Sequence, residues 1–286
     1  MRAPSFSSLK TKCQKFRSIA LLCTDLEGLF AFDYRVGSSN AAIADSLSRA
    51  GHRVTIVFVS RSASLVPVFR RCKARFKKSN IELRWLEEPP MIVEGLDPAR
   101  LSYAAYLYLR NQKFDLIHFQ GSHGLGYYTA LSKSLGLDFD KTLVCIDLHG
   151  PGYWARYANE ELVTEPNDIL KFYLERKSVE LADVLISPSQ YILNWAESEG
   201  WKLPQLKFVE QFPLSISPRS FQKGKTLKFK EIVFYGGLEI RRGIIEFCDA
   251  LNLLPKNFLK HMGIKVTFLG SRGIRNRINS DENYRS

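Results

Sequence analysis

The sequence lacks an apolar run long enough to cross a membrane. Its longest apolar stretches, such as 19–23 and 54–59, fall far short of the ~20 residues that a spanning helix needs. No uninterrupted apolar segment of ~7 to 15 residues precedes Asp25, which argues against a secretory signal. We therefore expect a soluble, cytoplasmic protein.

Cysteine is scarce and scattered. The five cysteines are odd in number, and no two of them form a Cys-x-x-Cys pair. This pattern favours neither a disulfide framework nor a zinc site. We expect most cysteines to be small core residues, and we expect neither a metal nor a cofactor.

Acidic residues are fewer than basic ones, and the excess of basic residues is concentrated in three segments of the chain. The chain has 29 acidic and 41 basic residues, a net charge of +12. Basic residues outnumber acidic ones by five to none in 1–17, by eight to one in 61–84, and by fourteen to six from 219 onward. Such patches bind phosphate, anionic lipid or nucleic acid, or they simply keep a surface solvated. No RNA-recognition motif is visible, so we expect no nucleic-acid partner.

Short apolar runs alternate with amphipathic stretches along the chain. The apolar runs predict parallel strands buried on both faces, at 18–24, 53–59, 81–86, 114–119, 142–147 and 184–187. Apolar residues at helical spacing predict helices at 40–50, 101–110, 126–135, 168–181 and 190–199. This repetition is typical of an α/β fold with a Rossmann-like, doubly wound parallel sheet. Such sheets bind ligands beyond the carboxyl ends of their strands.

Composition divides the chain into four parts. We predict a basic tail, a first Rossmann-like domain, a linker rich in proline, serine and basic residues, and the start of a second domain, at 1–17, 18–215, 216–230 and 231–286. The last part holds one predicted β-α-β unit before the composition turns polar. A lone β-α-β unit cannot bury both faces of its sheet. We therefore expect the second domain to be incomplete.

A glycine and two serines precede the first predicted helix, in Val36-Gly37-Ser38-Ser39-Asn40. Glycine permits close backbone approach, and free N–H groups at a helix start attract phosphate. A full Gly-x-Gly-x-x-Gly is absent. Phosphate contact at Gly37 and Ser38 is one interpretation, and a plain helix cap is the other.

Three histidines follow or end neighbouring predicted strands. His118 and His123 flank one strand end, and His149 follows the next strand, before Gly150 and Gly152. Together they predict a polar crevice at the sheet edge, although a histidine at a strand end is often only structural. Their spacing does not require a metal.

Two adjacent arginines follow a Gly-Gly turn in the second domain. Arg241 and Arg242 come just after Gly237, where the next helix is predicted to start. Arginine opposes the helix dipole at that end, so structure alone would favour acids there. A bound diphosphate would explain the pair.

Taken in order, these motifs resemble the family-4 retaining glycosyltransferases of GT-B architecture, over about residues 18–270. The resemblance also rests on segments 49–55, 114–118, 175–189 and the Gly-x-Leu-Glu-x-Arg-x-Gly segment at 236–243. It implies two Rossmann-like domains that face a cleft. Acceptor contacts would lie mainly in the first domain and nucleotide-sugar contacts mainly in the second.

The resemblance also implies roles for individual residues. Gly37 would lie in a loop facing the donor phosphates, and His149 would be the catalytic residue near the transferred sugar. Arg242 occupies the usual position of a diphosphate-binding lysine. Gly237 stands where the family usually has an arginine, and Arg241 is the candidate substitute.

The implied activity is sugar transfer from a nucleotide-sugar donor to a hydroxyl of a glycan or lipid-linked acceptor, with retention and without an implied metal. The family's glutamate-rich donor motif is not found in this chain. We therefore expect the 286-residue chain, read as truncated, to be impaired or inactive.

The alternative is a non-catalytic Rossmann-like module that binds an anionic membrane or nucleic acid through its basic patches. Residues 68–78 alternate apolar with basic side chains. They predict a helix lying on a surface, with Phe69 and Phe76 anchoring the protein peripherally on the inner face of a membrane.

Overall fold

The computed structural model describes residues 17–26, 34–60, 65–86, 97–212 and 229–270. The chain forms two compact units: Met1–Gly152 with Thr164–Ser217, and Tyr153–Val163 with Pro218–Ser286. The predicted basic tail, except Arg17, and the predicted linker, except its last two residues, lie outside the described residues.

A seven-stranded sheet, parallel throughout, forms the centre of the first unit. Its strand order is β3-β2-β1-β4-β5-β6-β7. The strands are β1 (Ser18–Cys23), β2 (Arg53–Val59), β3 (Ile81–Leu86), β4 (Leu116–Gln120), β5 (Leu143–Asp147), β6 (Val184–Ser187) and β7 (Leu206–Val209). The six predicted strands and the Rossmann-like fold class are confirmed. Strand β7 was not predicted, because it is a four-residue edge strand in which only Phe208 is buried.

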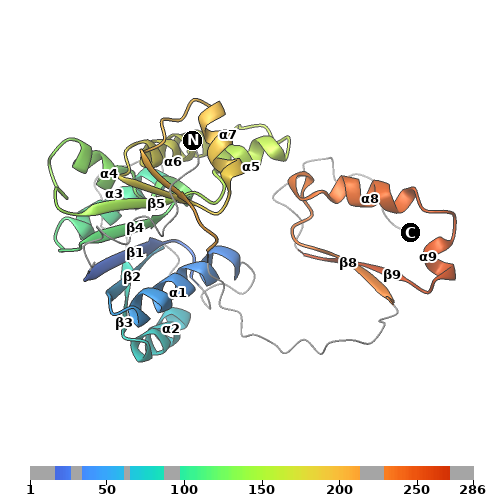
Figure 1. Ribbon diagram of the computed structural model, residues 1–286, viewed down its shortest axis with the longest axis horizontal. Helices are drawn as coiled ribbons and strands as arrows, with labels where there is room; N and C mark the ends of the chain where they lie inside the picture. Colours follow the sequence, from blue (N-terminus) through green and yellow to red (C-terminus); the bar gives the residue numbers. More distant parts are fainter. Residues whose placement is uncertain (1–16, 27–33, 61–64, 87–96, 213–228, 271–286) are drawn as a thin grey trace. The chain divides into compact units, whose positions relative to one another are not determined.

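Helices cover both faces of this sheet, as Figure 1 shows. They are α1 (Tyr34–Arg49), α2 (Val66–Lys78), α3 (Asp97–Leu109), α4 (Tyr127–Ser134), α6 (Pro166–Glu180) and α7 (Gln190–Ser198). Helices α1 and α2 contact strands β1 to β3, whereas α3, α4 and α6 pack against one another. Right-handed crossovers require this division, because the strand order runs one way from β1 to β3 and the other way from β4 onward.

The core under α1 and α2 is built from alternate strand residues. Leu21, Ile56 and Phe58 are almost completely buried there, as expected for strands covered on both faces. Phe58 and Phe69 both make edge or tilted ring contacts around Trp85. This apolar cluster joins α2 firmly to β2 and β3.

Helix α2 contradicts the predicted membrane anchor. Phe69 is 7% exposed and Phe76 is 1% exposed, so both rings lie in the core. The apolar residues recur every three to four positions because that stripe faces the sheet. The basic residues Arg71 and Lys73 are exposed on the opposite side. The phenylalanines therefore cannot insert into a membrane while the unit is folded.

Helix α1 begins six residues earlier than predicted, at Tyr34 rather than Asn40. Gly37 and Ser38 consequently lie inside its first turns and not in a loop, which corrects that expectation. One glycine costs a helix only about 1 kcal/mol, and here the Gly37 N–H also donates to the Asp25 carboxylate at 3.1 Å. The side chain of Ser38 lies outside the described residues.

The second unit contains a two-stranded parallel sheet, β8 (Glu231–Tyr235) with β9 (Lys265–Leu269). Helices α8 (Ile244–Asn252) and α9 (Phe258–His261) connect the strands. Most of α5 (Gly152–Ala158) also belongs to this unit, although its residues lie between strands of the first sheet in the chain. Among the described helices of the protein, none combines the length and apolarity needed to cross a membrane.

Candidate functional site

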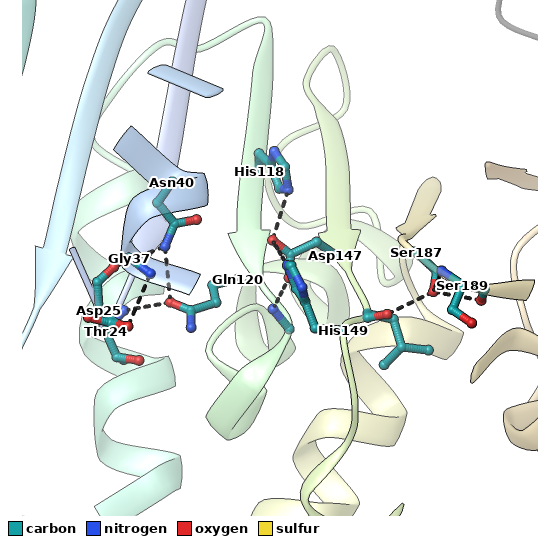
Figure 2. A network of polar contacts seen from close by, with 12 residues as sticks. Thr24, Asp25, Gly37, Asn40, His118, Gln120, Asp147, His149, Ser187 and Ser189 are labelled. Atoms are coloured by element: carbon teal, nitrogen blue, oxygen red, sulfur yellow. Dashed lines mark hydrogen bonds and ion pairs between the residues drawn. The ribbon is translucent and has the colours of Figure 1, made fainter. Parts of the chain in front are cut away.

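The strand order of the first sheet reverses between β1 and β4, which is where doubly wound sheets hold ligands. Gln120, the last residue of β4, accepts a hydrogen bond from the Thr24 N–H at 3.1 Å. The Asn40 side-chain amide donates to the Asp25 carbonyl at 2.9 Å and approaches Gln120 Oε1 at 3.5 Å. Figure 2 shows how these contacts tie the ends of β1, α1 and β4 together. The carboxyl edge of the sheet at this point is therefore held by polar side chains.

A buried carboxylate at the end of the next strand, β5, faces two imidazoles (Figure 2). Asp147 ends β5 and is 1% exposed. Its Oδ2 lies 3.4 Å from His118 Nε2 and 3.6 Å from His149 Nε2. These separations exceed those of a tight hydrogen bond, and both imidazoles face the same carboxylate oxygen. Its Oδ1 accepts a 2.8 Å hydrogen bond from the Gly121 N–H.

The surroundings of Asp147 keep it ionised. Burial opposes ionisation, but the two imidazoles outweigh it and hold the pKa of Asp147 well below its ordinary value. The charge of Asp147 also adds to burial in raising the pKa of the Cys145 thiol. The site therefore holds one fixed negative charge at the carboxyl edge of the sheet.

His149 is placed by the loop that follows β5. Its ring stacks on Phe212, with centroids 4.3 Å apart and planes 26° apart. The preceding residue, Leu148, donates its N–H to the Ile186 carbonyl and accepts a 2.9 Å hydrogen bond from the Ser187 hydroxyl. The His149 side chain remains 27% exposed. Because Leu148 is hydrogen-bonded to β6 and Phe212 stacks on the ring, the imidazole is held at the edge and still reaches solvent.

Close packing between the loops after β4 and β5 requires glycine. A Cβ at Gly121 would lie only 1.8 Å from the Asp147 carbonyl oxygen. No side chain can be accommodated against that backbone atom. Gly121 thus lets the two loops approach closely enough for its N–H to reach Asp147.

His123 occupies a different position from His149. Its backbone has a φ of 66°, and its N–H donates to Glu175 Oε1 at 2.9 Å. The same buried carboxylate accepts the Gly152 N–H at 2.7 Å through Oε2. Burial and, next, repulsion from Lys171 lower the pKa of His123 to about 4, which keeps its imidazole neutral near pH 7. Its role in substrate binding stays a prediction.

The two predicted arginines lie together in the second unit. Arg241 and Arg242 form a short 3-10 turn before Gly243, which has a φ of 78° and precedes α8. The carboxylate of Glu239 contacts both guanidinium groups, at 2.5 Å for Arg241 and 3.4 Å for Arg242. The turn therefore holds two cations on one anion.

Residues from α5 and the loop after it also hold this turn. The Arg241 N–H donates to Asn159 Oδ1 at 3.1 Å, and its guanidinium lies 5.9 Å from the centroid of the Trp154 ring. Asn159 in turn donates to Glu161, which pairs with Arg156. The placement of Arg241 thus depends on residues about 80 positions earlier in the chain.

The structure brings Gly237, Arg241 and Arg242 together in the turn of the second unit. Gly37, His123 and His149 all follow the carboxyl ends of strands in the first sheet, but each contacts a different carboxylate, that of Asp25, Glu175 or Asp147. Sequence reasoning assigned no contact to the partners of these residues: Asp147, Glu175, Glu239 and Asn159. Glu175 and Glu239 stood in segments that carried the family resemblance, but their contacts were not predicted. Asp147 carried a usable signal, because positions 147 and 149 are two apart at a strand end and therefore point to the same side.

Comparisons with known proteins agree with this architecture. Residues 36–203 match the model of Glycosyltransferase Family 4. Among curated proteins, none matches this sequence. The catalytic domain of starch synthase IV from Arabidopsis thaliana is similar in fold, with a TM-score of 0.52 and 11% identity over 90% of this chain and 69% of that one.

Two further solved structures are more distant. The glycotransferase of kitacinnamycin gives a TM-score of 0.46 with 9% identity over 93% of this chain and 68% of that one. UGT73P12 from Glycyrrhiza uralensis gives a TM-score of 0.37 with 13% identity, and this chain covers 46% of its length. The chain thus spans less than half of that relative.

Proposed function

The chain belongs to glycosyltransferase family 4, and we propose that it transfers a sugar from a nucleotide-sugar donor to an acceptor hydroxyl with retention of anomeric configuration. The observation that carries this proposal is the His118–Asp147–His149 cluster beside the switch point of the sheet. The acceptor would be a glycan or a lipid-linked hydroxyl.

His149 is the residue we assign to the reacting sugar. When the nucleoside diphosphate leaves, positive charge develops on the sugar. A fixed negative charge nearby stabilises that charge, and Asp147 supplies one next to the His149 ring. Because the ring is stacked on Phe212 and remains partly exposed, it can contact a ligand without first reorganising.

The diphosphate of the donor is assigned to Arg241 and Arg242. Guanidinium groups bind phosphate oxygens through paired charge-assisted hydrogen bonds. They would also neutralise the negative charge that builds up on the leaving group. Gly37 and Ser38 contribute less to this assignment, because the Gly37 N–H already donates to the Asp25 carboxylate.

We also infer that this 286-residue chain is a slow transferase. In the described part of the second unit, β8 and β9 leave large side chains uncovered, with Tyr235 75% exposed and Phe268 45% exposed. Efficient stabilisation of a transition state requires a rigid site that excludes water. A sheet so open would hold the arginine turn only loosely.

The test measures turnover by the purified chain with a panel of nucleotide-sugars and with glycan or lipid-linked acceptors. The measured signal is the release of nucleoside diphosphate. We expect His149→Ala to lower kcat by about 100-fold or more, whereas His261→Ala, which alters an exposed histidine of α9, leaves kcat unchanged. The anomeric signal of the product, read by NMR, should match that of the donor. An inverted product, or equal activity of the two variants, would refute the proposal.

A non-catalytic surface-binding module is the second candidate. Helix α2 favours it, since Arg70, Arg71, Lys73 and Lys77 are exposed and the helix has no acidic residue. With both phenylalanines buried, contact with an anionic membrane would be purely electrostatic and sensitive to salt. Sedimentation with anionic vesicles, combined with no nucleoside diphosphate binding, would favour this candidate over the transferase.

A further inference from the structure

The arginine turn of the second unit carries its own anion. Glu239 Oε2 contacts the guanidinium groups of both Arg241 and Arg242. Its side chain is 15% exposed, and those of the arginines are 22% and 25% exposed. One carboxylate therefore neutralises half of the positive charge that would otherwise face a ligand.

Glycine at position 237 makes this arrangement possible. A Cβ at Gly237 would lie 2.7 Å from Glu239 Oε1, which is too close for any ordinary contact. It would also approach Arg242 Nε at 3.4 Å. Even an alanine side chain would thus compete with the Glu239 carboxylate for the same space. Gly237 lets Glu239 fold back onto the arginines.

We propose that Glu239 is a specificity-determining residue of this site: its carboxylate occupies Arg241 and Arg242 until a ligand with two linked phosphates displaces it. The inference rests on the proposed function, in which the two arginines bind a diphosphate. It adds that a single phosphate group, which carries less charge and fewer acceptor oxygens than two linked phosphates, competes less well with Glu239 for the two guanidinium groups.

The selectivity follows from charge and reach. The two arginine side chains converge on one carboxylate oxygen, so an incoming anion must release that contact before it gains its own. Orthophosphate carries up to about two negative charges near pH 7 and is compact. Linked phosphates carry more charge and can give each guanidinium its own paired hydrogen bonds. Specificity here arises from an element that opposes the wrong ligand.

The experiment is calorimetric titration of the full chain with inorganic pyrophosphate and, separately, with orthophosphate at low salt. Glu239→Gln removes the competing charge and nearly keeps the side-chain shape. Gly237→Ala leaves Glu239 intact but pushes its carboxylate aside. The control is Asp249→Asn, which removes one negative charge from an exposed position on α8 that forms no ion pair among the described residues.

We expect both Glu239→Gln and Gly237→Ala to bind pyrophosphate about fivefold more tightly than wild type, the equivalent of releasing one partly exposed ion pair. The affinity for orthophosphate should rise by a larger factor, so that the preference for pyrophosphate falls. Asp249→Asn should change either affinity by less than about twofold.

Weaker or unchanged pyrophosphate binding by both variants would overturn the inference, because Glu239 would then orient the arginines and not compete with the ligand. Arg241→Ala and Arg242→Ala separate this failure from that of the proposed function. If they abolish pyrophosphate binding, the arginine site stands whatever Glu239 does. If they leave it unchanged, the assignment of the diphosphate and the role of Glu239 both fail.

Discussion

At the scale of single residues, the candidate site depends on the charged carboxylate of Asp147, whose partners come from the sheet and its loops. Asp147 is buried, and a carboxylate in such a position needs compensating partners. It has the Gly121 N–H on one oxygen and two imidazoles facing the other. These partners come from β4 and from the loops after β4 and β5. Asp147 thus links the carboxyl edge, where the candidate site lies, to the stability of the sheet.

Asp147→Asn should destabilise the protein most near neutral pH. The folded-state pKa of Asp147 lies below that of an unfolded carboxyl, which is about 4. Its stabilising contribution is therefore present above pH ~4 and is lost as the pH falls further, toward the folded-state pKa. We expect a loss of about 2 to 4 kcal/mol at pH 7 in urea unfolding. The difference from wild type should shrink below pH ~4.

The control for this measurement is Asp140→Asn, at an exposed position. It should change the free energy of unfolding by less than about 0.5 kcal/mol at either pH. An Asp147→Asn protein as stable as wild type at pH 7 would show that the two imidazoles do not stabilise the carboxylate.

The sequence located some of these residues but not their partners. His149 and Arg242 stand in recognisable strand-end and turn motifs, so local pattern was enough to select them. Glu239 stands in the same turn motif as Arg242, but its contact with the arginines was not predicted, and Asn159 had no such signal. Asn159 contacts Arg241 across 82 positions, and no local periodicity encodes a pairing of that length. Gly37 was placed in a loop and not in a helix, because its contact with Asp25 is also tertiary.

At the scale of elements, the turn between β4 and α4 is fixed by its packing on α6. Gly124 has a φ of 63°, and a Cβ there would lie 2.3 Å from Leu174 Cβ and 2.6 Å from the Leu174 carbonyl carbon. The next residue of α6, Glu175, accepts the His123 N–H from the same turn. One helix therefore fixes both the path of the turn and the backbone of His123.

Gly124→Ala should be severely destabilising, and Gly136→Ala supplies a matched control. Both glycines have nearly the same positive φ, 63° and 68°, but a Cβ at Gly136 meets nothing within 4 Å. The left-handed conformation alone costs about 1 to 2 kcal/mol in each variant. The backbone clash at Gly124 should add about 2 kcal/mol or more. Thermal and urea unfolding of the two variants would measure this difference directly, and equal losses would contradict it.

The spacing of apolar residues predicted helix α2, but it did not predict what the apolar face of that helix contacts. Apolar residues spaced three and four apart identify one face of a helix, and a membrane and a sheet satisfy that face equally well. The decisive partners, Phe58 and Trp85, lie on β2 and β3. The burial of Phe69 therefore became visible only once the strands were placed beside the helix.

At the scale of the whole molecule, the chain enters the second unit twice. It does so first at 153–163, returns to the first unit, and enters again from 218 onward. The predicted boundary at 216–230 reflected composition, which carries no signal for the earlier excursion. Glu175 holds Gly152, the last residue before that excursion, through its backbone N–H. The arginine turn thus receives support from a segment that leaves the first sheet immediately after the loop that carries His149.

This arrangement predicts that Asn159→Ala will loosen the second unit without affecting the first. The substitution removes the acceptor of the Arg241 N–H and the donor to Glu161. Losing one such hydrogen bond costs about 1 kcal/mol, so amide hydrogen exchange across 236–245 should accelerate about fivefold.

Exchange in β4 and β5 should be unchanged, because local openings in separate packing units are independent. Asn194→Ala, which alters an exposed side chain that accepts a hydrogen bond from Gln190 on α7, is the control and should leave 236–245 unaffected. Uniform acceleration across both sheets in Asn159→Ala would mean that the excursion stabilises the molecule as one cooperative body, and equal exchange in 236–245 would mean that Asn159 does not hold the turn.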